Sequence, residues 1–172
     1  FKLPVHLAFT YDEEVGCGGA DRLMKLLKAA GHVLPRCAVV GEPTGFQVFR
    51  MHKGFTTAKA TVRGVEGHSG KPELGVNATY PAAQIIAKLM EVEQERKRHR
   101  SMEQFFQFPY TTLSVGLVNG GTAVNIIPNR CEVVFEYRTM PDEDPMYVYR
   151  QVEGYVSEVL RPQLKKRDPR AD

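Results

Sequence analysis

The sequence has few cysteines, little net charge and no long apolar run. A membrane-spanning helix needs about 20 consecutive apolar residues, so the lack of such a run excludes a transmembrane segment. The three cysteines, Cys17, Cys37 and Cys131, are too few and too scattered for a disulfide framework or a zinc knuckle. We therefore expect reduced thiols in a cytoplasmic protein.

The first residues also lack the features of a signal peptide. Residues 1–9 have no basic start, no separate apolar stretch and no small-residue cleavage site. They are typical instead of a core strand that is already under way. A chain that opens inside a strand suggests a fragment of a longer protein.

Neither composition nor charge favours a nucleic-acid partner. The formal net charge is +3, with 42% apolar and 25% charged residues, as in ordinary globular proteins. One basic cluster, residues 96–100, follows a helical pattern with glutamates upstream. We interpret it as the solvated C-terminal end of a helix, where cations also suit the helix dipole.

The first 44 residues have the pattern of a βαβ unit. Residues 2–10 form an apolar run of strand length, and residues 20–30 have helical spacing. Gly31 then ends the helix, and residues 37–40 form a second short apolar run. Strand, helix and strand with short connections predict two parallel, buried strands of an α/β domain.

The rest of the chain predicts an α+β domain with ferredoxin-like topology. Alternation predicts a long strand over about residues 47–63, followed by a glycine-rich loop over 64–75. The order β-α-β-β-α, with a last strand to follow, is the split βαβ arrangement. We expect strands at 112–118, 123–127 and 131–138, a hairpin turn at 119–121, and a final helix that begins at Asp144-Pro145.

A long helix should follow the glycine-rich loop. Asn77 or Thr79 can cap it, and Pro81 falls in its first turn, where proline is tolerated. Its buried face is expected to consist of Ala82, Ile85, Ile86, Leu89 and Met90.

Three glutamates follow the two predicted parallel strands. Glu13 and Glu14 come just after the first strand, and Glu42 comes just after the second. Ligands bind beyond the carboxyl ends of such strands, and a divalent cation would relieve the repulsion among three carboxylates. One carboxylate of the pair could hold the metal while its neighbour acts as a general base. Alternatively, the pair only stabilises the first turn of a helix through its dipole.

Several segments occur in the order and spacing of a known family. They are Thr10-Tyr11-Asp12-Glu13-Glu14-Val15-Gly16, Val40-Gly41-Glu42-Pro43-Thr44, His52-Lys53-Gly54, Gly67-His68-Ser69-Gly70 and Gly75-Val76-Asn77-Ala78. They resemble the metallopeptidase-type family that contains acetylornithine deacetylase, succinyl-diaminopimelate desuccinylase, aminoacylases and carboxypeptidases. The second half is most similar to acetylornithine deacetylase, in Pro109–Leu113, Gly120-Gly121 and Asn125–Pro128.

The resemblance covers nearly the whole chain and implies its domain organisation. Residues 1–45 would be a fragment of a catalytic α/β domain of the zinc-peptidase type. Residues 46–172 would be a ferredoxin-like lid and dimerisation domain, which carries the contact of a homodimer.

The resemblance also implies an amidohydrolase with two zinc ions, which cobalt can replace. Glu13 matches the general base that activates the bridging water, Glu14 a ligand of one zinc, and Glu42 a ligand of the other. The implied reaction removes the acetyl group from N2-acetyl-L-ornithine in arginine biosynthesis. A succinyl-diaminopimelate desuccinylase, or a broad aminoacylase or dipeptidase, is the alternative within the family.

Three residues of the second domain match further site positions of the family. His68 matches a lid histidine that reaches the partner subunit's site and stabilises the oxyanion, although a glycine-flanked histidine is also an ordinary loop residue. Asn125 and Arg138 match positions that hold the substrate. Arg138 suits a carboxylate through its bidentate fork, or an ion pair with Glu136 or Glu132 at a strand end.

The family's other metal ligands, an upstream H-x-D pair and a distant downstream histidine, have no match here. None of the five histidines is followed by x-Asp. Glu14 and Glu42 give two protein ligands for two metals, fewer than the three that each catalytic zinc needs. We therefore expect the 172-residue chain alone to be inactive. A module for dimerisation only is the rival of another class, whereas a nucleic-acid-binding domain would need exposed aromatics that the strands lack.

Overall fold

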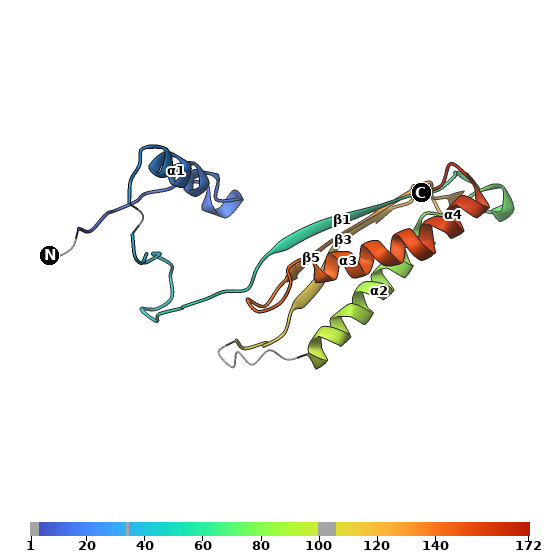
Figure 1. Cartoon of the computed structure of the whole chain (residues 1–172). Helices are drawn as coiled ribbons and strands as arrows, with labels where there is room; N and C mark the ends of the chain where they lie inside the picture. The colour runs from blue at the N-terminus through green and yellow to red at the C-terminus, as the bar shows by residue number, and fades with distance from the viewer. Residues whose placement is uncertain (1–3, 34, 100–105) are drawn as a thin grey trace. The chain divides into compact units, whose positions relative to one another are not determined.

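The computed structural model describes residues 4–33, 35–99 and 106–172. Figure 1 labels the main helices and strands along the chain. The chain divides into two compact units, Phe1–Val48 and Phe49–Asp172. The beginning of the strand predicted at 2–10, and Arg100 of the basic cluster, lie outside the described residues.

The described residues of the first unit contain one α-helix. A short 3-10 turn, η1 (Glu13–Val15), precedes α1 (Gly18–Ala29). The Asp12 carboxylate accepts a hydrogen bond from the Gly19 N–H at 2.8 Å and so fixes the start of α1. Gly31 has a φ of 70° directly after the helix, as its predicted role in ending the helix requires.

The two parallel strands predicted on either side of this helix are not formed in the part of the first unit that the structure describes. Residues 4–10 and 37–40 have no assigned strand. Their apolar side chains are exposed, with Phe9 at 90% and Val39 at 97%. Parallel strands need neighbours and helices that cover both faces, and a single helix cannot provide this cover. The helix prediction was confirmed, whereas the prediction of paired, buried strands was wrong for this structure.

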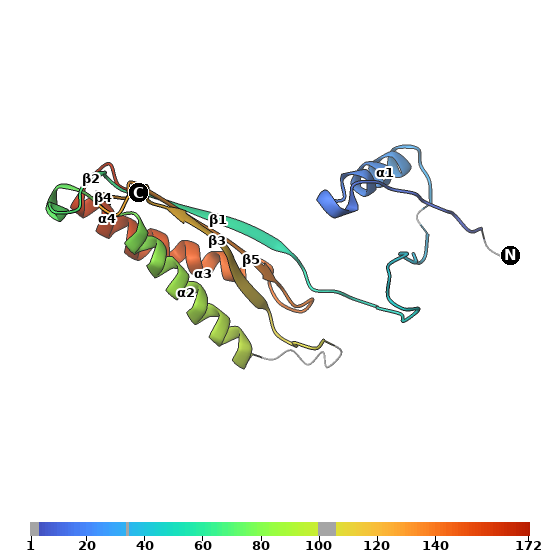
Figure 2. The same ribbon diagram turned by 180° about the vertical axis from the view of Figure 1, so that it is seen from behind.

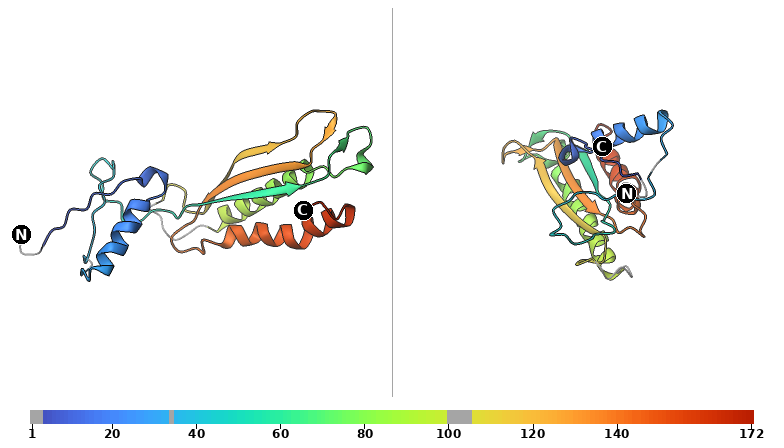
Figure 3. Two further views of the ribbon diagram at one scale, coloured as in Figure 1. Left: turned by 90° about the horizontal axis from the view of Figure 1, so that it is seen from above. Right: turned by 90° about the vertical axis from the view of Figure 1, so that its left-hand side faces the viewer.

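The second unit is a sheet covered on one face by helices. Its strands are β1 (Thr56–Arg63), β3 (Thr112–Gly120) and β5 (Arg130–Arg138), in the order β1-β5-β3. Both pairings are antiparallel, so β1 and β3 run parallel with β5 between them. The same face is covered by α2 (Thr79–Arg98) and by a long helical segment (Figures 1 and 3). That segment consists of α3 (Tyr147–Tyr155), η3 (Val156–Leu160) and α4 (Arg161–Arg167).

This arrangement confirms the predicted split βαβ topology. The last strand of that topology is expected along the free edge of β1. Asp172 lies on this edge, where its backbone N–H and C=O exchange hydrogen bonds with Arg63 at 2.8 and 2.6 Å. The end of β1 at Arg63 therefore already has a backbone hydrogen-bond partner on the edge where the last strand is expected. No helix in the described ranges combines the length and the apolar character needed to cross a membrane.

The predicted hairpin at 119–121 is wrong, because β3 continues through Gly120. A Cβ on Gly120 would lie 2.8 Å from the Cys131 Sγ, so glycine permits the close β3–β5 approach at this point. The strand expected at 123–127 shortens to β4 (Ile126–Ile127), which pairs with β2 (Gly67–His68) and not with β3. Figure 2 shows this small β2–β4 ribbon at one end of the sheet.

Two other element boundaries differ from the predictions. The strand predicted over 47–63 is regular only from Thr56. The final helix begins at Tyr147, and Asp144 precedes it in a turn in which its carboxylate accepts the Met146 N–H at 2.9 Å. Both boundaries were placed too early by the sequence pattern.

Asn77 organises the start of α2, but the N-cap residue is Ala78 and neither Asn77 nor Thr79, the two predicted caps. Its side-chain oxygen accepts hydrogen bonds from the Thr79 N–H at 2.9 Å and from the Thr79 hydroxyl at 2.6 Å. The apolar stripe of α2 then packs on the sheet, but Val92 takes the place predicted for Met90, which is 60% exposed. The buried residues of α2 are Pro81, Ala82, Ile85, Leu89 and Val92.

We expect Leu89→Ala to lower the free energy of unfolding by about 2–5 kcal/mol, because Leu89 is fully buried and its truncation leaves a cavity. Met90→Ala, one residue further on the exposed side of the same helix, should change it by less than about 0.5 kcal/mol. Urea unfolding of both variants measures the difference. Equal losses would contradict the packing described for α2.

The C-terminal end of α2 is not the solvated surface that the basic cluster predicts. The side chain of Arg96 is only 13% exposed, and its guanidinium lies 4.2 Å from the centroid of the Tyr147 ring. Glu95 accepts a hydrogen bond from the Tyr147 hydroxyl at 2.7 Å, which is the main cause of its lowered pKa. The prediction was wrong for Arg96, because an aromatic side chain of α3 covers it.

Candidate functional site

The three glutamates of the predicted metal site all lie in the first unit. Glu13 and Glu14 form η1, and Glu42 lies in an irregular segment after residues 37–40. All three are exposed. In the described residues, no group of three or more His, Cys, Asp or Glu side chains is arranged to hold a metal ion. Carboxylates are suitable zinc ligands in kind, but these residues are too few to complete a site.

His68 has a defined environment in the second unit. It lies in β2, opposite Ile126 of β4, and its side chain is exposed. The backbone N–H of Gly70 donates a hydrogen bond to its Nδ1 at 3.0 Å. The Lys71 N–H donates to the His68 carbonyl at 2.9 Å and closes a turn around the imidazole. Hydrogen bonds of the backbone therefore give the loop around His68 a defined conformation.

The structure brings Asn125 to the same ribbon, although it is distant in sequence. Its carbonyl accepts a hydrogen bond from the Ser69 N–H at 3.0 Å, so Asn125 lies directly across from the His68 turn. The Asn125 side chain is exposed. Two of the predicted site residues, His68 and Asn125, thus lie at the same end of the second unit, because β2 pairs with β4. We call this end, formed by the β2–β4 ribbon and its loops, the tip.

Glycines make this tip possible because the backbones approach closely. A Cβ on Gly64 would lie 2.0 Å from the Val76 carbonyl oxygen, and one on Gly75 would lie 2.8 Å from the Val65 carbonyl oxygen. Such distances exclude any other residue without backbone movement. The sequence therefore indicates this close-packed loop through its glycines, at positions 64 and 75 and in the Gly67–Gly70 segment.

Arg138 lies away from the tip, at the opposite end of β5. The ribbon joins the sheet beside Arg130, where the Gly64 N–H donates to the Asn129 carbonyl. Arg130 and Arg138 are the two ends of β5, and at about 3.3 Å per residue they are roughly 25 Å apart. One small substrate cannot touch His68 and Arg138 of the same chain.

The side chain of Arg138 is half exposed and already has two partners. Its Nε lies 3.3 Å from Glu136 Oε1, and its guanidinium lies 4.4 Å from the centroid of the Phe55 ring. The ion pair with Glu136 was an alternative expected from the sequence. Glu132, the other candidate, instead pairs with Arg130 at 2.8 Å and with Lys59 at 3.2 Å. The stacking of Phe55, which directly precedes β1, was not predicted.

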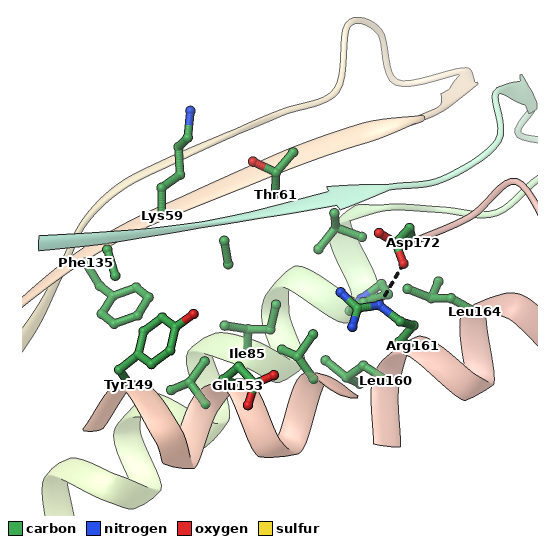
Figure 4. A pocket seen from close by; sticks show the side chains of 16 residues that line it. Lys59, Thr61, Ile85, Phe135, Tyr149, Glu153, Leu160, Arg161, Leu164 and Asp172 are labelled. Carbon is green, nitrogen blue, oxygen red and sulfur yellow. Dashed lines mark hydrogen bonds and ion pairs between the residues drawn. The ribbon is translucent and has the colours of Figure 1, made fainter. Parts of the chain in front are cut away.

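A groove of about 230 Å³ was also not predicted from the sequence. It lies between β1 and the C-terminal helical segment, with Ile85, Phe135 and Leu160 among its apolar lining residues (Figure 4). At one end, Arg161 forms an ion pair with Asp172 at 2.8 Å. Its lining is mainly aliphatic and aromatic and contains none of the predicted site residues.

The three cysteines are free thiols, as expected. Cys17 and Cys37 are exposed, whereas Cys131 is buried in β5. Burial raises the pKa of the Cys131 thiol, which favours its neutral form. None of the three is placed for metal ligation with other ligand-type side chains in the described residues.

Comparison with known families matches residues 50–163 to the peptidase dimerisation domain of the M20 type. Among curated proteins, the acetylornithine deacetylase of Myxococcus xanthus is 38% identical over 160 residues, which are 93% of this chain and 41% of that protein. The acetylornithine deacetylase of Pasteurella multocida is 34% identical over 139 residues, covering 81% of this chain and 35% of that protein. The chain thus spans about two fifths of the length of the curated relatives it matches.

Solved structures share the fold of part of this chain. A hydantoinase/carbamoylase family amidase from Burkholderia ambifaria matches with a TM-score of 0.51 at 16% identity, over 64% of this chain and 26% of that one. At this identity the likeness concerns the fold alone.

Proposed function

The chain belongs to the M20 peptidase family through its dimerisation domain, and on this basis we propose that it is part of an amidohydrolase that deacetylates N2-acetyl-L-ornithine. The observation that carries this proposal is the 38% identity to an acetylornithine deacetylase, which extends beyond the dimerisation domain to 93% of the chain. We further propose that residues 1–45 contribute to a catalytic α/β domain, that residues 46–172 form its lid, and that the protein acts in the cytoplasm.

In the proposed site, Glu14 and Glu42 would each hold one of two zinc ions, together with further ligands that this sequence does not contain. Zinc, when bound, lowers the pKa of a coordinated water to near neutrality and polarises the amide carbonyl. Glu13 accepts the proton of the attacking water on a carboxylate oxygen and later donates it to the leaving amine. Adjacent positions suit a general base, Glu13, and a metal ligand, Glu14, because neighbouring side chains of a tight turn point in different directions.

We propose that His68 and Asn125 act on the active site of the partner subunit. The distance of roughly 25 Å along β5 between the ribbon end and Arg138 supports this, because His68 and Arg138 of a single chain cannot both contact one substrate. A second copy resolves the conflict: Arg138 binds the substrate carboxylate, and the partner's His68 donates to the oxyanion.

The edge of the sheet supports a homodimer. β3 is an edge strand, and it carries Leu117 at 59% and Val118 at 52% exposure. A long, partly apolar edge strand can pair with the same strand of a second copy across a two-fold axis. Sedimentation of the 172-residue chain over a range of concentrations tests this, and a monomer throughout would refute a dimer through this domain alone.

Substrate turnover by the intact protein tests the proposed reaction. We expect release of acetate from N2-acetyl-L-ornithine, with a much lower kcat/KM for N-succinyl-diaminopimelate and for N-acylated neutral amino acids. Activity should disappear on zinc chelation and return with zinc or cobalt. A preference for the succinyl substrate would favour the desuccinylase alternative instead.

The 172-residue chain alone should not hydrolyse N2-acetyl-L-ornithine, even with excess zinc. Glu14 and Glu42 provide two protein ligands where two catalytic zinc ions need about three each. A colorimetric assay for ornithine, with intact enzyme at the same concentration as control, measures this. Zinc-dependent turnover by the chain would show that our ligand assignment is wrong.

A further inference from the structure

We infer that Gly70 is a positioning residue whose backbone N–H holds His68 in the tautomer that carries its proton on Nε2. This N–H donates to Nδ1 of His68 at 3.0 Å. A neutral imidazole has one donor and one acceptor nitrogen, so an Nδ1 that accepts must be unprotonated. The proton therefore lies on Nε2, the nitrogen that has no hydrogen-bond partner among the described residues.

The backbone, and not packing, fixes this geometry. His68 is exposed, so surrounding side chains do not determine the orientation of its ring. Instead, the Lys71 N–H binds the His68 carbonyl at 2.9 Å, and the Ser69 N–H binds the Asn125 carbonyl at 3.0 Å. These two bonds hold the peptide of Gly70 between them, with its N–H directed at the imidazole.

A side chain at position 70 would crowd the imidazole. A Cβ there would lie 3.2 Å from Nδ1 and 3.4 Å from Cε1 of His68, so the exposed ring would have to move by a few tenths of an ångström. The φ of Gly70 lies outside the left-handed region, so its backbone would accept other residues. A side chain at this position would therefore move the imidazole without changing the fold of the turn.

The consequence for chemistry rests on the proposed function of His68. With the proton on Nε2, the neutral imidazole offers a hydrogen-bond donor to a developing oxyanion at the exposed end of the ring. The other tautomer would present a lone pair there and repel the same charge. The hydrogen bond from Gly70 thus makes His68 a hydrogen-bond donor to the substrate and not a base that abstracts a proton.

The test uses the uniformly 15N-labelled 172-residue chain at about pH 8.5, above the ordinary titration range of histidine. We expect a scalar coupling across the hydrogen bond between the Gly70 amide nitrogen and Nδ1 of His68, with imidazole shifts of the Nε2–H form. A His68 ring protonated on Nδ1, or the absence of this coupling, would overturn the inference.

Gly70→Ala supplies the matched change, with Gly154→Ala as its control because a Cβ on Gly154 meets nothing within 4 Å. Gly70→Ala should lose the coupling while the other amide signals stay in place, and Gly154→Ala should keep it. In the intact enzyme, Gly70→Ala should lower kcat about 10-fold with little change in KM, as expected for a displaced oxyanion donor.

Failure of this inference is distinguishable from failure of the proposed function. If the coupling is present but His68→Ala leaves kcat unchanged, Gly70 still sets the tautomer, and the oxyanion role of His68 is wrong. If the coupling is present in Gly70→Ala as strongly as in the unmodified chain, the backbone N–H of residue 70 still sets the tautomer, and the expected displacement of the imidazole by a Cβ is wrong.

Discussion

A mixture of two inactive variants, His68→Ala and Glu13→Gln, is expected to regain about a quarter of the unmodified rate in the intact enzyme. Each variant alone should lose about 10²-fold or more in kcat, because one lacks the oxyanion donor and the other the general base. When subunits exchange at random, about half of the dimers contain one copy of each variant. In such a dimer, one of the two sites combines an intact Glu13 with the partner's intact His68.

The geometry of the second unit gives this expectation its physical basis. His68 and Asn125 lie at the β2–β4 tip, and Arg138 lies at the far end of β5. If His68 instead served the site of its own chain, no site in the mixed dimer would be complete, and the mixture would stay inactive. Mixing His68→Ala with Asn125→Ala provides the control. In the mixed dimer each site receives His68 and Asn125 from one partner chain, so no complete site can form.

The sequence was sufficient to predict the split βαβ topology of the second unit because the signals for its main strands and helices are local and redundant. The alternation of Ala58, Ala60 and Val62 with polar residues predicts which face of β1 packs on the helices, and the structure agrees. The polar residue Asn77 ahead of the helix and the stripe that includes Leu89 predict the second layer in the same way. These features depend only on residues within a few turns of one another.

The first unit shows where such reasoning fails. The runs at 2–10 and 37–40 are suitable for strands, but a strand exists only where another strand accepts its hydrogen bonds. Burial of Phe9 or Val39 would require sheet neighbours and covering helices that the described residues of this unit do not provide. Sequence pattern thus predicts the tendency to form a strand, while the pairing depends on distant chain segments.

The candidate site was predictable in part for the same reason. The glycines around His68 indicate close backbone approach, but its pairing with β4, and hence its proximity to Asn125, is a long-range contact. The predicted hairpin at 119–121 placed β4 beside β3 and would have moved Asn125 away from His68. In the structure Gly120 instead pairs with Cys131 of β5, at a close approach that the sequence does not reveal.

Glu13→Gln is expected to lower kcat of the intact enzyme by about 10³-fold while leaving its zinc content unchanged. Glutamine keeps the size and hydrogen-bonding oxygen of the side chain but cannot accept the proton of the attacking water. Glu14→Gln, the adjacent substitution, should instead weaken zinc binding, because an amide oxygen is a poorer zinc ligand than a carboxylate. Both residues lie in η1 and both are exposed in the structure, so neither change should disturb packing.

Metal analysis and kinetics on the same samples separate the two roles. Excess zinc should restore much of the rate of Glu14→Gln and none of the rate of Glu13→Gln, since added metal cannot replace a missing base. Loss of zinc from Glu13→Gln, with Glu14→Gln fully loaded, would mean that the two adjacent roles are exchanged. Retention of full activity by both variants would remove Glu13 and Glu14 from the chemistry and, with them, the main physical reason to place a metal-assisted hydrolysis in this part of the chain.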